Sequence, residues 1–517
     1  MFTFPFQLST FNSQLSIINY QLSPPPNTYQ RVSSPSFFSL PFAKQLTLKK
    51  IGIIFLLALT QSILAQPLPS KAQLQWQQQE FYLFAHFGPN TFTGKEWGEG
   101  TEKEALFNPT ALDCSQWCRI AKAAGAKGII ITAKHHDGFC LWPSQYSTHT
   151  VKQSPWKNGK GDVLKELSQA CKKYGLAFGV YLSPWDRNHP DYGTDKYNQV
   201  FVGMMQEIFA NYGPITELWW DGANGEGPNG KKQVYDWALF KQTVKRLSPN
   251  TLVFSDVGPH IRWVGNESGF AGTTNWNLLD TAGFTPGLGA PSVDTLNSGN
   301  YNGSAWIPAE CDVSIRPGWF YHAEENDKVK TPAQLFAIYQ KSVGRGANLL
   351  LNVPPNQQGR VHANDSATLM GFARLRQQSF GRNLFKKSDT YHLYGGILKK
   401  EPAANDGNPA TVAIFTESVR ESVGVERKQQ IPINCVVLRE DLSQGQHCVR
   451  FKLLLFDQKE KLVKEIYGTT IGNKRIISFP AVGVSTIELT IEEQNGPTRI
   501  REIEGYLIAE KLVEQQQ

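Results

Sequence analysis

A regular alternation of short apolar runs and amphipathic helical patterns between residues 75 and 355 constrains the fold of this chain most strongly. The apolar runs lie at residues 81–88, 128–133, 176–182, 215–218, 252–254 and 347–353. Helical patterns lie between them at residues 114–124, 163–174, 200–212 and 234–247. Strands that are apolar on both faces are typical of a parallel sheet covered by helices. The pattern therefore predicts an α/β fold, an irregular (β/α)8-like barrel of the TIM type over residues 66–384.

The pattern changes after about residue 385. Strand-like runs at 433–438 and 449–456 flank a polar turn, and residues 484–491 alternate between apolar and polar with a period of about two. This alternation is typical of strands that bury one face. We therefore expect residues 385–517 to form a C-terminal all-β sandwich domain. Its role is left open between binding sugar and stabilising the barrel by packing.

The first 65 residues have the composition of a targeting region rather than of a folded domain. Residues 1–43 are rich in Ser, Pro, Asn and Gln, and they are expected to be disordered or to precede the true start of the protein. Lys49 and Lys50 precede an apolar run that ends at Ala65, which is the pattern of a secretory signal peptide over residues 44–65. The run is too short for a stable membrane anchor. We expect export to the periplasm or the extracellular space, or to a lysosome or the apoplast in a eukaryote, without stable membrane insertion after cleavage.

Charge and cysteine content exclude several classes of protein. The net charge of +7 is modest for 517 residues, and the Lys and Arg residues form no basic stripe, so nucleic acid is not an expected partner. The seven Cys residues include no Cys-x-x-Cys pair, which argues against a zinc site and against a dense disulfide framework. Cys435 and Cys448 flank the expected hairpin and could pair with each other.

Polar and aromatic residues collect at the ends of successive expected strands. In a barrel of this type the active site lies at the carboxyl ends of the strands. The residues at or just after these ends are His86, Glu96, Trp97, His135, His136, Tyr181, Trp219, Asp221 and Glu267. One such residue carries little information, but five successive strand ends with this composition predict a site.

Two of these residues form a pair of acids suited to sugar chemistry. Asp221 follows Trp219 and Trp220 at the tip of a short apolar run, and Glu267 lies in a Gly-rich stretch after the next one. Two carboxyl groups, one on each side of the bond, are the usual minimum for cleaving a glycosidic bond. Indole faces can stack on the C–H face of a pyranose ring. The pattern therefore favours a carbohydrate-cleaving site.

A metal site is the main alternative interpretation of His86, His135, His136 and Asp137. Adjacent residues on an extended segment point to opposite faces, which makes joint ligation by His135 and His136 awkward. Neutral imidazoles can both donate and accept hydrogen bonds, as sugar hydroxyl groups require. We therefore expect a site without a metal and an enzyme without a cofactor.

The motifs of the expected barrel resemble those of glycoside hydrolase family 29, the α-L-fucosidases, between about residues 75 and 372. They are His86-Phe87-Gly88, Glu96-Trp97, Lys134-His135-His136-Asp137-Gly138-Phe139, Trp219-Trp220-Asp221-Gly222-Ala223 and Leu349-Leu350-Leu351-Asn352. Residues 261–267, 310–313 and 316–319 are similar to the subgroup that acts on branched α-1,3/1,4-linked fucose.

The resemblance implies a retaining hydrolase in which Asp221 is the nucleophile and Glu267 the acid/base. It places the fucose of a fucosylated glycan or oligosaccharide on the residues His86, Glu96, Trp97, His135, His136, Tyr181, Trp219 and Trp319. Glu310 and Asp312 are either part of a subsite for the leaving sugar or hydrogen-bonding residues of a loop. Two other functions remain open, namely another retaining exo-glycosidase on the same fold and a catalytically inactive carbohydrate-binding protein.

Overall fold

The computed structural model describes residues 66–514. Residues 1–43 and the expected signal peptide at 44–65 lie outside this part of the chain, so the predictions made for them stay predictions. Residues 66–514 belong to one compact unit. No helix among them is long and apolar enough to cross a membrane.

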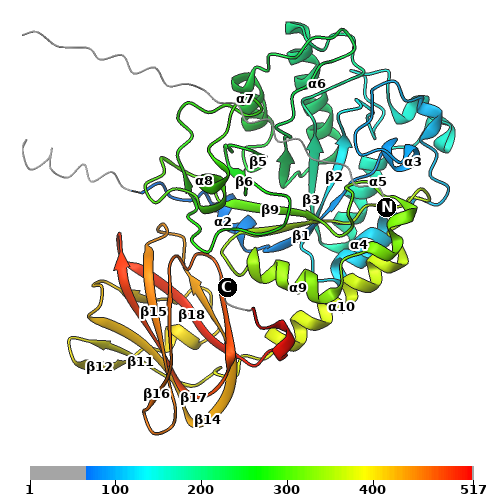
Figure 1. Ribbon diagram of the computed structural model, residues 1–517. Helices are drawn as coiled ribbons and strands as arrows, with labels where there is room; N and C mark the ends of the chain where they lie inside the picture. Colours follow the sequence, from blue (N-terminus) through cyan, green and yellow to red (C-terminus); the bar gives the residue numbers. More distant parts are fainter. Residues whose placement is uncertain (1–65, 515–517) are drawn as a thin grey trace, which may run out of the picture. The chain divides into compact units, whose positions relative to one another are not determined.

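Eight parallel strands close into a barrel, which confirms the expected fold class (Figure 1). Around the barrel the strands follow the order β1, β10, β9, β6, β5, β4, β3 and β2, and β2 pairs with β1. Their bounds are β1 Phe81–Ala85, β2 Gly128–Lys134, β3 Ala177–Leu182, β4 Glu217–Trp219, β5 Leu252–Ser255, β6 Ile261–Trp263, β9 Ala309–Ser314 and β10 Asn348–Asn352. Every residue of β1, β2, β9 and β10 is buried, as expected of a barrel covered by helices.

Helices surround the barrel strands (Figure 1). They are α2 Lys71–Gln77, α3 Asn90–Thr93, α4 Cys114–Ala123, α5 Val163–Tyr174, α6 Asp195–Tyr212, α7 Trp237–Leu247, α8 Val293–Ser298, α9 Pro332–Lys341 and α10 Ala363–Phe380. Local signals fix several of their ends. The side chain of Asp113 accepts a 2.8 Å hydrogen bond from the backbone N–H of Gln116 at the start of α4. Gly175 ends α5 with a φ of 68°, a conformation that favours glycine.

The long connection between β6 and β9 consists largely of loops. It also contains α8 and a small two-stranded sheet formed by β7 Leu278–Leu279 and β8 Ala305–Trp306. The barrel is therefore complete in strands, and its irregularity lies in the long connection between β6 and β9.

The C-terminal domain is a single antiparallel sheet that doubles back on itself. Its strands are β11 Asp389–Tyr394, β12 Ile397–Lys400, β13 Ala413–Phe415, β14 Glu421–Glu440, β15 Cys448–Phe456, β16 Leu462–Gly468, β17 Arg475–Gln494 and β18 Thr498–Tyr506. The first half of β14 pairs with β11, and its second half pairs with β18. Shifts in register between β14 and β17 let both long strands pass from one layer to the other. The expected all-β domain is thus confirmed.

The predicted domain boundary at residue 385 falls between α10, which ends at Phe380, and β11, which begins at Asp389. Glu80, in the turn before β1, joins the two domains. Its carboxylate accepts hydrogen bonds from Lys474 (2.6 Å) and Arg439 (3.1 Å), both in the C-terminal domain.

All seven cysteines are free and buried. Cys435 and Cys448, which could have paired by their sequence positions, do not form a disulfide in this structure. The sulfur atoms of Cys118 on α4 and Cys171 on α5 lie 3.8 Å apart.

Candidate active site

A pocket of about 120 Å³ lies at the carboxyl ends of the barrel strands, and all ten residues that the sequence predicts for the site line it. They are His86, Glu96, Trp97, His135, His136, Tyr181, Trp219, Asp221, Glu267 and Trp319. Phe84 and Asp312 complete the lining. The two acids thus face one cavity although they follow different strands, Asp221 after β4 and Glu267 after β6.

Hydrogen bonds fix the orientation of the Asp221 carboxylate. The phenol of Tyr181 donates to its Oδ2 over 3.0 Å, and the backbone N–H of Ala223 donates to its Oδ1 over 2.7 Å. The side chain is 26% exposed, so the carboxylate remains accessible from the pocket. Burial and the nearby charge of Asp221 raise the pKa of Tyr181 well above 10, which keeps the phenol protonated and able to donate.

The three predicted histidines are buried and uncharged at neutral pH. Burial lowers the pKa of His86 to about 3 and that of His135 well below its ordinary value. Burial also lowers the pKa of His136 to about 4, although Asp221 opposes the shift. The Nε2 atom of His136 lies 3.8 Å from Oδ2 of Asp221, but this contact is not an ion pair at neutral pH because the imidazole carries no charge.

The ring nitrogens of these histidines are partly committed to the protein. His86 Nδ1 lies 2.9 Å from Oδ1 of Asn352, and His136 Nδ1 lies 2.8 Å from Oγ of Ser183. His135 Nδ1 is buried and has no hydrogen-bond partner among the described residues. A neutral imidazole can donate from one nitrogen and accept at the other. The histidines can therefore bind hydroxyl groups in the pocket without bringing a charge into it.

Aromatic rings form the floor and one wall of the pocket. Trp219 stacks on Phe254, with ring centroids 4.0 Å apart, and on Tyr181, with centroids 5.2 Å apart. Trp97 meets His136 edge to face at 5.3 Å and remains 55% exposed. Its exposed face is available to an apolar surface of a ligand.

Glu267, Trp319 and Asp312 also line the pocket. Trp319 Nε1 donates a 3.2 Å hydrogen bond to Oε2 of Glu267, which is exposed. Asp312 is 4% exposed and accepts a 2.9 Å hydrogen bond from Trp263 Nε1. Burial, followed by the charge of Glu267, raises the pKa of Asp312 well above its ordinary value.

Glu310 and Asp312, for which two roles remained open, both lie on strand β9 rather than in a loop. Glu310 is fully buried below the pocket, where it accepts hydrogen bonds from the phenol of Tyr82 and from Trp219 Nε1 (2.8 Å). Glu310 does not line the pocket itself, but it supports the floor of the pocket through its hydrogen bond with Trp219. Asp312 does line the pocket. Neither Asp312 nor His322, which contacts Glu96, is among the ten residues that the sequence predicts for the site.

No cluster of three or more His, Cys, Asp or Glu side chains within residues 66–514 is arranged to hold a metal ion. The pocket itself is lined by four carboxyl groups, on Glu96, Asp221, Glu267 and Asp312, together with three neutral imidazoles and several aromatic faces. This set can bind a small, neutral, polyhydroxylated ligand and can transfer protons to and from it.

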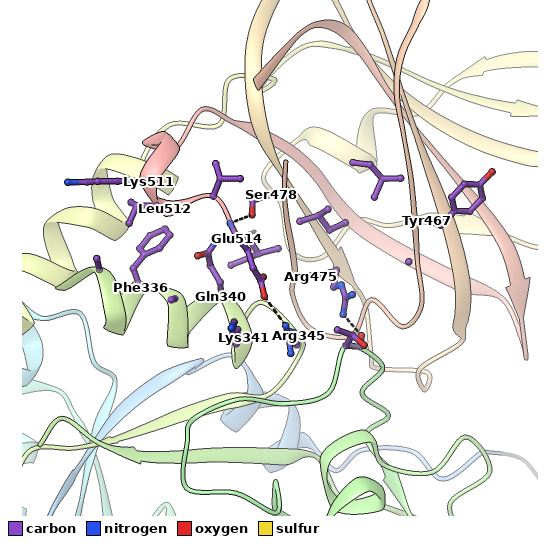
Figure 2. A pocket seen from close by; sticks show the side chains of 18 of the residues that line it. Phe336, Gln340, Lys341, Arg345, Tyr467, Arg475, Ser478, Lys511, Leu512 and Glu514 are labelled. Carbon is purple, nitrogen blue, oxygen red and sulfur yellow. Dashed lines mark hydrogen bonds and ion pairs between the residues drawn. The ribbon is translucent and has the colours of Figure 1, made fainter. Parts of the chain in front are cut away.

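A second and larger cavity, of about 720 Å³, lies between α9 and the C-terminal domain (Figure 2). Glu514 is the one acidic residue among those that line it. Arg345 donates to the carboxylate of Glu514 over 2.9 Å, and Ser478 Oγ accepts a 2.9 Å hydrogen bond from the backbone N–H of Glu514 (Figure 2). It contains no pair of facing acids, so its size alone does not make it the reactive site.

A family model described as alpha-L-fucosidase matches residues 70–376. Alpha-L-fucosidase 1 of Arabidopsis thaliana is 42% identical over 424 residues, which cover 80% of this chain and 82% of that protein. The putative alpha-L-fucosidase 1 of Oryza sativa subsp. japonica is 42% identical over 436 residues, which cover 82% of each chain.

Solved structures extend this similarity to both domains. A putative alpha-L-fucosidase from Bacteroides ovatus is 42% identical with a TM-score of 0.75, and the match covers 88% of this chain and 76% of that one. A glycoside hydrolase family 29 fucosidase from Ruminococcus gnavus, solved in complex with fucose, is 29% identical with a TM-score of 0.76, and the match covers 87% and 96%.

Proposed function

The chain belongs to the alpha-L-fucosidase family, glycoside hydrolase family 29, and from this premise we propose that it is an exported, retaining hydrolase of terminal α-1,3- or α-1,4-linked L-fucose. Alpha-L-fucosidase activity itself follows from the family and from relatives that cover most of the chain. One observation supports the proposed chemistry above all others. Asp221 and Glu267 come from different strand ends and line the same small pocket, whose other walls are neutral histidines and indoles.

The proposed reaction is a double displacement. Asp221 attacks the anomeric carbon, and the bond from this carbon to the glycosidic oxygen breaks while Glu267 gives its proton to that oxygen. The product of the first step is a fucosyl ester on Asp221. Glu267, now a carboxylate, removes a proton from water, which attacks the same carbon and releases fucose with its original anomeric configuration.

The remaining residues of the pocket are proposed to bind the fucose ring. His86, His135 and His136 are neutral, so each can pair with a hydroxyl group without the cost of burying a charge. Trp97, Trp219 and Trp319 offer apolar faces to the ring and to the methyl group that fucose carries in place of a hydroxymethyl group. Tyr181 and Glu96 complete the proposed set.

The preference for α-1,3/1,4 linkages rests on the similarity of residues 261–267, 310–313 and 316–319 to that subgroup of the family. Export rests on the signal-like pattern of residues 44–65. A protein cleaved after Ala65 would begin at Gln66, which N-terminal sequencing of the mature protein can establish. An intact N-terminus on protein recovered from the producing cells would contradict this part of the proposal.

The activity is tested with a panel of nitrophenyl glycosides, followed by Lewis-type trisaccharides and 2′-fucosyllactose. We expect turnover of the α-L-fucoside within the panel and preferential release of fucose from the Lewis-type trisaccharides. Proton NMR of the first product should show α-L-fucose, as retention requires. Turnover of a different glycoside would indicate another exo-glycosidase, and no turnover at all would favour a carbohydrate-binding protein without activity.

A further inference from the structure

The loop that carries Trp319 is held by a carboxylate from a distant part of the chain. Glu96 lies 223 positions earlier than Trp319 and accepts a 2.7 Å hydrogen bond from its backbone N–H. The other carboxylate oxygen of Glu96 accepts a 3.3 Å hydrogen bond from the backbone N–H of Phe320. In this structure Glu96 thus binds the polypeptide around Trp319.

His322 is the third group on the same carboxylate. Its Nε2 atom lies 2.5 Å from Oε1 of Glu96, and its side chain is 9% exposed. Its backbone carbonyl accepts a 3.2 Å hydrogen bond from Arg316, which is fully buried and pairs with Asp365. His322 is therefore tied to the core of the barrel on one side and to Glu96 on the other.

Gly318 leaves the space in which Glu96 and His322 meet. A Cβ atom at position 318 would lie 2.6 Å from Oε1 of Glu96 and 3.0 Å from Cδ2 of His322. Real Cβ atoms essentially never approach a neighbour as closely as the first of these distances. Any larger side chain would push the two groups apart.

Trp319 connects this arrangement to the proposed acid/base. Its Nε1 donates to Glu267 over 3.2 Å, and its backbone carbonyl accepts a 2.7 Å hydrogen bond from Asn352. Asn352 also contacts His86. The position of the indole therefore depends on Glu96 and His322 at one end and sets the position of the Glu267 carboxyl group at the other.

We propose that Glu96 and His322 form a clasp that positions Trp319, and through it Glu267, for proton transfer to the leaving group. The inference rests on the proposed role of Glu267 as the acid/base. His322 is a positioning residue in it, because it acts on Trp319 and Glu267 through Glu96. Glu96 has a structural role in addition to any contact with fucose.

Leaving-group dependence tests the clasp. A misplaced acid slows departure of a sugar, which needs a proton, far more than departure of dinitrophenolate, which does not. We expect His322→Ala to lower kcat/KM by roughly 10- to 100-fold on a Lewis-type trisaccharide and by less than about threefold on 2,4-dinitrophenyl α-L-fucoside. His322→Gln, whose amide can donate to Glu96, should recover most of the loss.

Gly318→Ala is a second variant that separates the same two groups without removing either, and it should show the same selective loss. His392→Ala is the matched control, because His392 forms a comparable pair with Glu421 (3.2 Å) in the C-terminal domain. It should leave both rates unchanged. Thermal unfolding of each variant reports whether it is folded.

Equal losses on the two substrates, or no loss on either, in folded His322→Ala and Gly318→Ala would overturn the clasp. The proposed function has a separate readout, since a wild-type enzyme that turns over neither the trisaccharide nor the dinitrophenyl fucoside would refute the function itself. If Glu267→Ala lost activity equally on both substrates, Glu267 would not be the acid/base, and the proposed clasp would be refuted as well.

Discussion

The phenol of Tyr181 donates a 3.0 Å hydrogen bond to Oδ2 of Asp221, and the same ring stacks on Trp219. Tyr181 thus contacts both the proposed nucleophile, which it orients, and the aromatic ring that forms the floor of the pocket. Burial and the charge of Asp221 raise the pKa of Tyr181 well above 10, so the phenol is a donor at neutral pH.

Removal of this donor should slow the reaction without unfolding the protein. A hydrogen bond to a charged group contributes about 1.5–3 kcal/mol, so Tyr181→Phe should lower kcat/KM by roughly 10- to 100-fold. Steady-state kinetics on an aryl α-L-fucoside measures the effect. Tyr192→Phe, which removes a phenol hydrogen-bonded to Tyr235, is the control and should leave the rate near that of the wild type. Comparable losses in both variants would show that the effect is not specific to Asp221.

Small external nucleophiles should separate the roles of the two acids. Asp221→Gly should lose roughly 10³-fold or more in kcat, and azide should restore turnover with β-fucosyl azide as the product, since azide then attacks the substrate directly. Glu267→Ala should instead yield α-fucosyl azide, because azide attacks the fucosyl ester on Asp221. Glu324→Ala, which removes an exposed acid, is the control. NMR of the azide products decides the assignment, and the same anomer from both variants would contradict it.

The contact of Glu80 with the C-terminal domain should make stability depend on pH. Burial alone would raise the pKa of Glu80, but Lys474 and Arg439 outweigh it and lower the pKa from 4.5 to about 2. The folded pKa lies below the unfolded one, so the stabilisation is complete above pH 4.5 and is lost as the pH falls towards 2. Glu80→Gln should therefore lower the free energy of unfolding by about 3 kcal/mol at pH 7.

This difference should shrink steadily when urea unfolding is repeated at pH 5, 4 and 3. Glu99→Gln breaks an exposed pair with Lys95 and should leave the free energy of unfolding nearly unchanged at every pH, because solvent screens such pairs. A Glu80→Gln effect of constant size from pH 7 to pH 3 would show that shape, rather than charge, accounts for the stabilisation.

Replacement of Glu310 by Gln should change the stability of the protein little, whereas replacement by Ala should lower it clearly. Burial and the charge of Glu217 raise its pKa well above the ordinary value, and its carboxyl group accepts hydrogen bonds from Trp219 and Tyr82. Glu310→Gln keeps an acceptor for Trp219 and should cost about 1 kcal/mol or less. Glu310→Ala leaves both donors unsatisfied and should cost about 2–4 kcal/mol of unfolding free energy. Chemical denaturation of the two variants side by side measures the difference, and equal costs would show that the hydrogen bonds to Trp219 and Tyr82 do not account for the stabilisation.

The sequence reveals six of the eight barrel strands because their residues are apolar on both faces. It does not reveal β6, which is only three residues long, or β9, whose sequence alternates Glu310, Asp312 and Ser314 with apolar neighbours. These three side chains face the barrel interior, where β9 contributes polar groups to the pocket and its floor. The alternation of polar and apolar residues in β9 could have indicated a strand. However, such alternation is typical of a strand with one face exposed to solvent, so it does not predict a buried barrel strand.

The ten site residues could be located from the sequence because a barrel brings its strand ends to one face. Each of them lies within a few residues of an apolar run or belongs to a motif of the family. His322 has neither property. Its contact with Glu96 depends on how the loop after β9 folds back, and residue spacing in the sequence carries no information about that path.

The contact of Glu80 with the C-terminal domain also has a consequence for biosynthesis. Glu80 directly precedes the first barrel strand, yet its partners lie 359 and 394 positions further along the chain. A ribosome releases Arg439 and Lys474 only after every barrel strand has been made. The ion pairs of Glu80 can therefore form only late in translation. A truncated chain that stops near residue 384 would contain the Glu80 carboxylate without either of its cationic partners.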